Sequence, residues 1–372
     1  MTPDACRAGR RSSPTLTSSG RISRALAPLL SLALVVLAGT SLVQGSSDLL
    51  GAEEVVRGLR GALGLGEPLE GGPGFVFDLR LRRTLVAIAV GASLAYSGAL
   101  LQGLFRNALA SPSVLGISTG ATVGASVAIL VVGGHGASVL VEQAVEMAPL
   151  FVSLCAFLGA LATTLVVTLL GTRGGRLSVP TLLLAGIAMN TCLGGLLAAL
   201  QAYALQDNLQ VARALVSWTF GSLTDHATLR VGVVWGGLLA PALVAPFVAR
   251  ELDLLAGGEE DAASLGVDTG RIRLLVIGAA SLATASAVAV AGQIAFLGLV
   301  VPHLLRLAGS TSHRRLLPLS MLAGACLLLG ADLAQRALIG HADLGPGVLM
   351  SMVGGPFFLF LLLRSRRELQ AW

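Results

Sequence analysis

The sequence lacks lysine altogether, so all 25 of its basic residues are arginine. A P-loop nucleotide site needs the lysine of a Gly-x-x-x-x-Gly-Lys motif to hold the terminal phosphates of ATP. The chain therefore cannot be an ATPase of the P-loop type. If ATP drives its function, the hydrolysis takes place on another protein.

Groups of residues that could bind a metal or catalyse a reaction are also missing. The histidines lie far apart, without cysteine or carboxylate companions at ligand spacing; they are His135, His226, His303, His313 and His341. The cysteines lack a metal-binding spacing, which argues against a disulfide framework as well; they are Cys6, Cys155, Cys192 and Cys326. The sequence predicts neither a metal site nor a cofactor in this chain, and it gives an enzyme activity little support.

Charged residues are scarce, at 12%, and the mean hydropathy is +0.82. Continuous stretches rich in Leu, Ala and Gly have about the 20 residues that a helix needs to cross a bilayer, whereas a β-barrel would show alternating polarity. We predict an all-α polytopic membrane protein with about ten transmembrane helices. The stretches are 25–44, 84–105, 114–133, 148–171, 181–204, 229–249, 272–291, 294–308, 316–339 and 346–363, of which 294–308 is short.

The arginines predict the orientation. If every stretch spans and the N-terminus is cytoplasmic, 17 arginines lie inside and 8 outside, so the positive-inside rule places both termini in the cytoplasm. The basic pI therefore reflects topology and does not indicate a nucleic-acid partner. We divide the chain into a disordered cytoplasmic tail (1–24), a transmembrane domain (25–364) and a short C-terminal tail (365–372). The run Leu26–Gly39 also fits a cleaved signal peptide, although the span count favours its retention.

Polar residues within the spans are costly in lipid, so each marks a pathway or a helix contact. Asp332 and Arg336 lie four residues apart and either neutralise each other or contact a partner. Gln102 and Asn190 are more often helix-helix hydrogen-bonding groups than substrate ligands. The other candidates are Gln293 and His303.

Three connections carry further signals. Between the sixth and seventh spans, Gly257-Gly258 followed by Glu259, Glu260 and Asp261 predicts a short helix that stops at Gly266. Outside the second span, Arg80, Arg82 and Arg83 either meet an acidic partner or anchor lipid headgroups. Between the first and second spans, Glu53 to Leu65 predicts a surface helix before a turn at Gly71–Gly74.

The residues resemble a known family, the FecCD-type permeases of binding-protein-dependent ABC importers for iron-siderophore, haem and vitamin B12. The matching motifs follow the family's order over about residues 25–364. They are Arg80–Arg83, Gly91–Gly98, Gln102, Arg106–Pro112, Leu115–Gly120, Leu182–Gly186, Trp218–Gly221, Ala262–Gly266, Gly298–His303, His313–Pro318, Ala331–Asp332 and Gly354–Phe357.

The resemblance implies a type II ABC importer permease in the cytoplasmic (inner) membrane of a bacterium. It implies a homodimer with one path along its axis, two ABC ATPase subunits that bind ATP and Mg²⁺, and one extracytoplasmic binding protein. It also implies roles for three sets of residues. The coupling helix within 257–266 would meet the ATPase through Glu259, Glu260, Ala262, Ala263, Leu265 and Gly266. The residues that dock the binding protein would be Arg80, Arg83 and Arg336. The cytoplasmic gate would comprise Asn107, Leu109, Ser178 and Val179.

The sequence departs from the family pattern at three places. Arg82 and Ala108 replace prolines, and Gly292–Phe296 lacks the usual Pro and Gly, which removes two chain-bending residues at the eighth span. The cargo predicted is an iron-siderophore or haem, with cobalamin as the alternative. An ion-coupled secondary transporter is a more distant alternative, disfavoured because Asp332 is the only acidic residue deep in a predicted span.

Overall fold

The computed structural model describes residues 19–45, 50–134, 141–173, 176–223, 228–339 and 345–364. Residues 1–18 of the predicted N-terminal tail and the whole predicted C-terminal tail, 365–372, lie outside the described residues. The first helix begins at Ser19, so residues 19–24 are helical and do not belong to a disordered tail.

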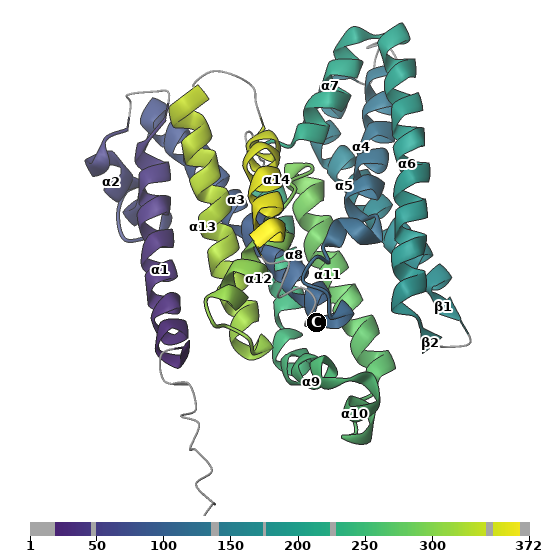
Figure 1. Ribbon diagram of the computed structural model, residues 1–372. Coiled ribbons are helices and arrows are strands. Elements are labelled where there is room, and N and C mark those ends of the chain that lie inside the picture. The colour runs from purple at the N-terminus through teal and green to yellow at the C-terminus, as the bar shows by residue number, and fades with distance from the viewer. Residues whose placement is uncertain are drawn as a thin grey trace, which may run out of the picture.

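The described residues form a helical bundle (Figure 1), which confirms the all-α prediction. A hairpin of two-residue antiparallel strands, β1 (Thr172–Arg173) and β2 (Arg176–Leu177), is the exception. The helices are α1 (Ser19–Val43), α2 (Ala52–Ala62), α3 (Gly71–Phe105), η1 (Pro112–Leu115, a 3₁₀ turn), α4 (Ile117–Gly134), α5 (Val141–Gly171), α6 (Val179–Asp207), α7 (Leu209–Phe220), α8 (Thr228–Ala242), α9 (Ala245–Gly257), α10 (Glu259–Ser264), α11 (Thr269–Ala291), α12 (Leu297–Leu307), α13 (His313–Ile339) and α14 (Pro346–Arg364).

The helices match the ten predicted stretches. By length and composition, α1, α3, α5, α6, α11 and α13 can each cross a membrane, and α8 with α9 passes the same test as a pair bent by 53°. The shorter apolar helices α4, α12 and α14 account for the other three stretches. The predicted single span at 229–249 is therefore wrong in detail, because the helix breaks after Ala242 and restarts at Ala245.

Helix α3 is the centre of the bundle. In its most apolar window 89% of the residues are buried, against 11% for α1 and α6. It packs most extensively against α13, and also against α11, α12 and α8. It begins at Gly71, so the predicted turn at Gly71–Gly74 is wrong and those residues form its first turn. Pro73 fits there because the first helical turn needs no backbone donor from it.

Two glycines of α3 allow the neighbouring helices to approach closely. A Cβ on Gly98 would lie 1.8 Å from the carbonyl oxygen of Gly298 on α12. A Cβ on Gly91 would lie 2.4 Å from the carbonyl oxygen of Gly324 on α13. Small residues that let backbones meet are the usual means of packing helices in lipid, where apolar side chains gain little by leaving the hydrocarbon.

The bend between α8 and α9 directs the chain across one end of the bundle, where α9 leads into α10 (Figure 1). We call this the α10 end and residues 245–264 the α9–α10 arm. The predicted short helix is confirmed as α10, which has Glu259, Glu260 and Asp261 in its first turn. Gly258 precedes it at φ 141° and Gly266 follows it at φ 86°, backbone conformations that favour glycine.

Candidate functional site

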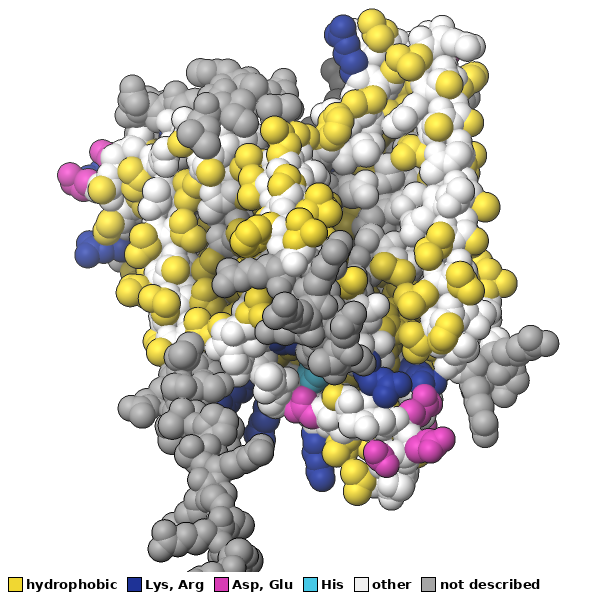
Figure 2. All heavy atoms as spheres, viewed as in Figure 1, with side chains coloured by type: hydrophobic (Ala, Val, Ile, Leu, Met, Phe, Trp, Pro, Cys, Tyr) yellow, Lys and Arg dark blue, Asp and Glu magenta, His cyan; other side chains and the backbone are white. Residues whose placement is uncertain are grey.

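The residues assigned to the coupling helix divide into two groups. Ala262 is fully buried and holds α10 against its own chain. Ala263 and Gly266 are exposed, and Leu265 is 68% exposed. Figure 2 shows acidic side chains gathered at this end of the molecule, and Glu260 is exposed among them. Small and apolar groups on a charged rim form a surface suited to another protein.

Glu259 is the member of this set with a partner in its own chain. Its Oε2 lies 2.5 Å from Nη2 of Arg273 on α11. The sequence analysis did not identify Arg273, because no local pattern shows that it contacts Glu259, 14 residues earlier in the chain. The α9–α10 arm is also held at α9, where Asp253 accepts hydrogen bonds from Ser312 Oγ at 2.7 Å and from the backbone N–H of His313 at 2.9 Å.

The predicted gate residues lie at two helix ends. Asn107 follows the end of α3, where Arg106 adopts φ 48°, and its Oδ1 accepts a 2.8 Å hydrogen bond from the backbone N–H of Leu109. Leu109 is 37% exposed. Ser178 is the N-cap of α6 and Val179 is its first residue. The structure thus places the first pair after α3 and the second pair at the start of α6.

At the opposite end, the three arginines predicted to dock a binding protein have partners within the chain. Arg80 is buried and its Nη1 donates to the carbonyl oxygens of Leu42 and Val43 at 3.0 and 2.6 Å. Arg336 donates to the carbonyl oxygen of Gln44 at 2.9 Å. Both therefore satisfy carbonyl groups that the end of α1 leaves without helical partners.

Asp332 is completely buried and forms salt bridges with both Arg83 and Arg336. Its Oδ1 accepts from Nη2 of Arg83 at 2.6 Å, with Arg83 Nε at 3.1 Å, and its Oδ2 lies 3.0 Å from Nη2 of Arg336. The predicted neutralisation of Arg336 by Asp332 is confirmed, and Arg83 is an unpredicted third member. Arg80 and Arg83 point in different directions, Arg80 toward the end of α1 and Arg83 toward Asp332 on α13. Four polar side chains, three basic and one acidic, meet at this end.

Two polar residues inside the bundle behave as predicted for helix contacts. Gln102 donates to the carbonyl oxygens of Gly298 and Leu299, both at 3.2 Å, and accepts from Arg306. Asn190 accepts from Thr119 at 2.6 Å and donates to the carbonyl oxygen of Ser113 at 2.9 Å. Both amides thus connect neighbouring segments of the bundle, as expected for helix-helix contacts.

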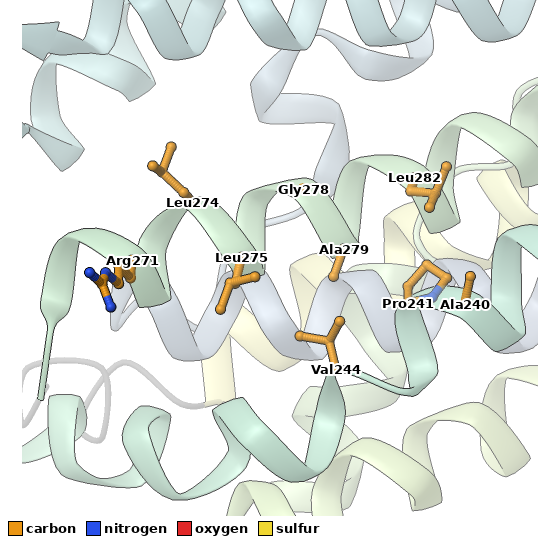
Figure 3. Close-up of a pocket in the computed structure, with 9 residues that line it drawn as sticks. All are labelled: Ala240, Pro241, Val244, Arg271, Leu274, Leu275, Gly278, Ala279 and Leu282. Carbon is orange, nitrogen blue, oxygen red and sulfur yellow. The ribbon is translucent and has the colours of Figure 1, made fainter.

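A groove of about 530 Å³ lies between α8 and α11 (Figure 3). It is lined by apolar residues of both helices, and Gly278 opens it by leaving space where a side chain would stand. Arg271 at one end is the only charged residue in the lining, and it pairs with Asp268 at 2.9 Å. Ligand sites usually combine an apolar lining with several convergent polar groups, so we assign this groove no ligand. In the part of the chain that the structure describes, no three His, Cys, Asp or Glu residues gather as a metal site.

Comparisons with known proteins decide the family. The model of the FecCD transport family matches residues 32–364. The chain is a FecCD permease. It is 40% identical over 292 residues to the hemin transport system permease protein HmuU of Yersinia pestis, which covers 78% of this chain and 84% of that one. It is 40% identical over 299 residues to the vitamin B12 import system permease protein BtuC of Klebsiella pneumoniae, covering 78% and 83%.

A solved structure supports the same assignment. A metal-chelate type ABC transporter in an inward-facing conformation matches this FecCD permease with a TM-score of 0.75 and 28% identity, covering 92% of this chain and 99% of that one. The FecCD permease is thus a multi-pass membrane subunit of an ABC importer. Its ATPase is a separate subunit, and the importer implies a substrate-binding partner as well.

Proposed function

We propose that the protein forms a homodimeric path for an iron chelate, a ferric siderophore or haem, across the cytoplasmic membrane of a bacterium. Both termini and the α10 end face the cytoplasm, in keeping with the excess of arginines on that side. The observation that carries this proposal is the exposed surface of Ala263, Leu265 and Gly266 at the tip of the α9–α10 arm. Two ATPase subunits dock there, one on each arm.

Cargo choice rests on relatives, because the described part of the chain shows no polar chelate site. The hemin permease relative and the metal-chelate structural match favour an iron chelate. Cobalamin is a second candidate because the vitamin B12 permease relative is equally identical, at 40%. A path that holds its cargo loosely needs few specific contacts. An apolar lining between the two subunits of the proposed homodimer would meet this requirement.

Reconstitution tests the function and the cargo together. Proteoliposomes that contain the permease, its ATPase and its binding protein are expected to import a ferric siderophore or haemin only when ATP is supplied. Permease without the ATPase is expected to hydrolyse no ATP, since the chain has no lysine for a P-loop. Uptake of cobalamin alone would select the second candidate. ATP-independent uptake driven by an ion gradient would overturn the proposal.

At the opposite end, we propose that the Arg80, Arg83 and Arg336 cluster orients an acidic surface of the binding protein. Arg83 and Arg336 share the single buried carboxylate of Asp332, so positive charge exceeds negative charge within this buried group. Arg83 and Arg336 retain 20% and 15% side-chain exposure, whereas Arg80 acts from a buried position. The field of such a charge excess speeds and orients docking more than it strengthens it, and raised salt weakens it.

Ala263→Trp is expected to uncouple ATP hydrolysis from transport. Ala263 is exposed on α10 beside the fully buried Ala262, so an indole there blocks close approach of the ATPase without disturbing the chain's own packing. ATP-driven uptake in proteoliposomes measures the effect. The matched control is Ala52→Trp, which changes an exposed alanine on α2 at the opposite end. Equal uptake by the two variants would show that α10 does not contact the ATPase.

A further inference from the structure

Arg273 joins two segments that are far apart in the sequence. Its Nη2 donates to Oε2 of Glu259 at 2.5 Å, and its Nη1 donates to the carbonyl oxygen of Leu177 at 2.6 Å. Glu259 is the first residue of α10, and Leu177 is the last residue of β2. The side chain of Arg273 is only 12% exposed, whereas that of Glu259 is 45% exposed, so the bond to Leu177 is better shielded from water than the ion pair.

The position of Leu177 makes the second contact informative. Ser178, the N-cap of α6, follows it directly, and Val179 begins that helix. The backbone N–H of Ser178 donates to the carbonyl oxygen of Gly171 at 2.9 Å, which ties the start of α6 to the base of the hairpin. A displacement of Leu177 therefore moves the two residues that the family resemblance assigns to the cytoplasmic gate.

Arg271 shows that this bridge is specific to one arginine of the same helix. Arg271 lies two residues earlier on α11, its side chain is 84% exposed, and it pairs with Asp268 three residues away. That local pair connects nothing beyond the helix start. Arg273 instead spans 14 residues to α10 and 96 residues to β2.

The guanidinium group suits a rigid connection. It is planar, stays charged and presents its donors in a fixed fork, so the positions of its two partners are coupled through one inflexible group. Charge-assisted hydrogen bonds of this kind are about twice as strong as neutral ones. A lysine ammonium is a single point charge on a flexible stem and holds two partners less well.

We propose that Arg273 is a positioning residue that transmits the movement of α10 to the start of α6. The proposal rests on the proposed function, since it needs an ATPase that moves α10. When the ATPase displaces the α9–α10 arm, Glu259 moves the guanidinium group of Arg273 through their ion pair. The guanidinium group then shifts the carbonyl of Leu177, and Ser178 and Val179 move with it. The residue touches no cargo and acts through the two segments that it joins.

Site-directed labelling tests the transmission without knowledge of the cargo. The readout is the rate at which a membrane-impermeant maleimide labels Ser178→Cys, in a background whose four native cysteines are replaced, with the ATPase and binding protein present. The labelling rate is expected to differ between the nucleotide-free complex and the complex trapped with ATP and vanadate. Arg273→Gln is expected to lose this difference while ATP hydrolysis persists. Arg271→Gln is the matched control and is expected to keep it.

Two further variants separate the contacts. Glu259→Arg combined with Arg273→Glu restores an ion pair but supplies no donor for the Leu177 carbonyl, so the difference in labelling is expected to stay lost. Its full recovery would overturn the bridge to β2. If Arg273→Gln fails to assemble, Arg273→Lys, which keeps the positive charge but loses the planar fork, is expected to show a reduced difference. A difference equal to that of the unsubstituted complex would overturn the proposal.

The outcomes also separate this proposal from the function on which it rests. A complex with Arg273 intact that hydrolyses ATP and shows no change in labelling contradicts the assignment of Ser178 to a moving gate. A complex that neither hydrolyses ATP nor imports a chelate contradicts the proposed function. Arg273→Gln that behaves like Arg271→Gln contradicts the positioning role alone.

Discussion

Asp332→Asn is expected to destabilise the protein more than any other single change considered for this chain. The carboxylate is completely buried and accepts bonds from Arg83 and Arg336. Loss of its charge leaves two guanidinium groups close together with no counter-ion, and breaking a buried pair in this way costs about 3–5 kcal/mol. Thermal unfolding of the detergent-solubilised protein measures the loss.

Asp78→Asn is the matched control for this prediction. Asp78 pairs with Arg82 near the same end of α3 at 2.5 Å, but the side chains are 48% and 30% exposed. Surface pairs of this kind contribute roughly 0–1 kcal/mol, so the control is expected to melt close to the unsubstituted protein. Equal melting temperatures for the two variants would mean that the buried cluster does not stabilise the fold.

A second variant, Gly98→Ala, is expected to lower stability although it adds only a methyl group. The new Cβ would lie 1.8 Å from the carbonyl oxygen of Gly298, and because that neighbour is backbone, α3 and α12 must separate. Overpacking of a close contact costs about 1–3 kcal/mol. The shift also disturbs the bonds from Gln102 to Gly298 and Leu299.

Gly278→Ala, on α11, is the control with the opposite expected sign. It has no neighbouring atom within 4 Å of the added Cβ, and glycine in a helix is less favourable than alanine by about 0.5–1 kcal/mol. The same substitution is therefore expected to lower the melting temperature at position 98 and to leave or raise it at position 278. A fall of equal size at both positions would contradict the close-packing explanation.

The buried cluster changes how the docking arginines should be tested. Reversing the charge of Arg83 places a carboxylate against Asp332, and reversing Arg80 places one against the carbonyl oxygens of Leu42 and Val43. Either change disrupts the fold before it reports on a partner. Salt dependence of binding-protein affinity, measured on the intact permease, probes the positive field without this complication.

Much of the architecture follows from local properties of the chain. Ten apolar stretches of nearly the right length were enough to place the transmembrane helices, because the cost of exposing backbone groups to lipid leaves few alternatives. The glycines and acidic residues around 257–266 were enough to place α10, because helix ends have strong local preferences. Asn190 and Gln102 could be assigned to helix contacts for the same kind of reason, since an unpartnered amide is costly in hydrocarbon.

Other features depend on which helices become neighbours. Hydropathy could not show that α3 extends back to Gly71, because its N-terminal part contains polar residues. Two of them, Arg80 and Arg83, are stabilised by hydrogen bonds to the end of α1 and to α13, which the local sequence does not reveal. The Arg83 contact to Asp332 across 249 residues and the Arg273 bridge to Leu177 likewise have no local pattern. Side-chain type, spacing and helix-end preference act within a few residues, whereas a salt bridge between helices exists only after packing has brought its partners together.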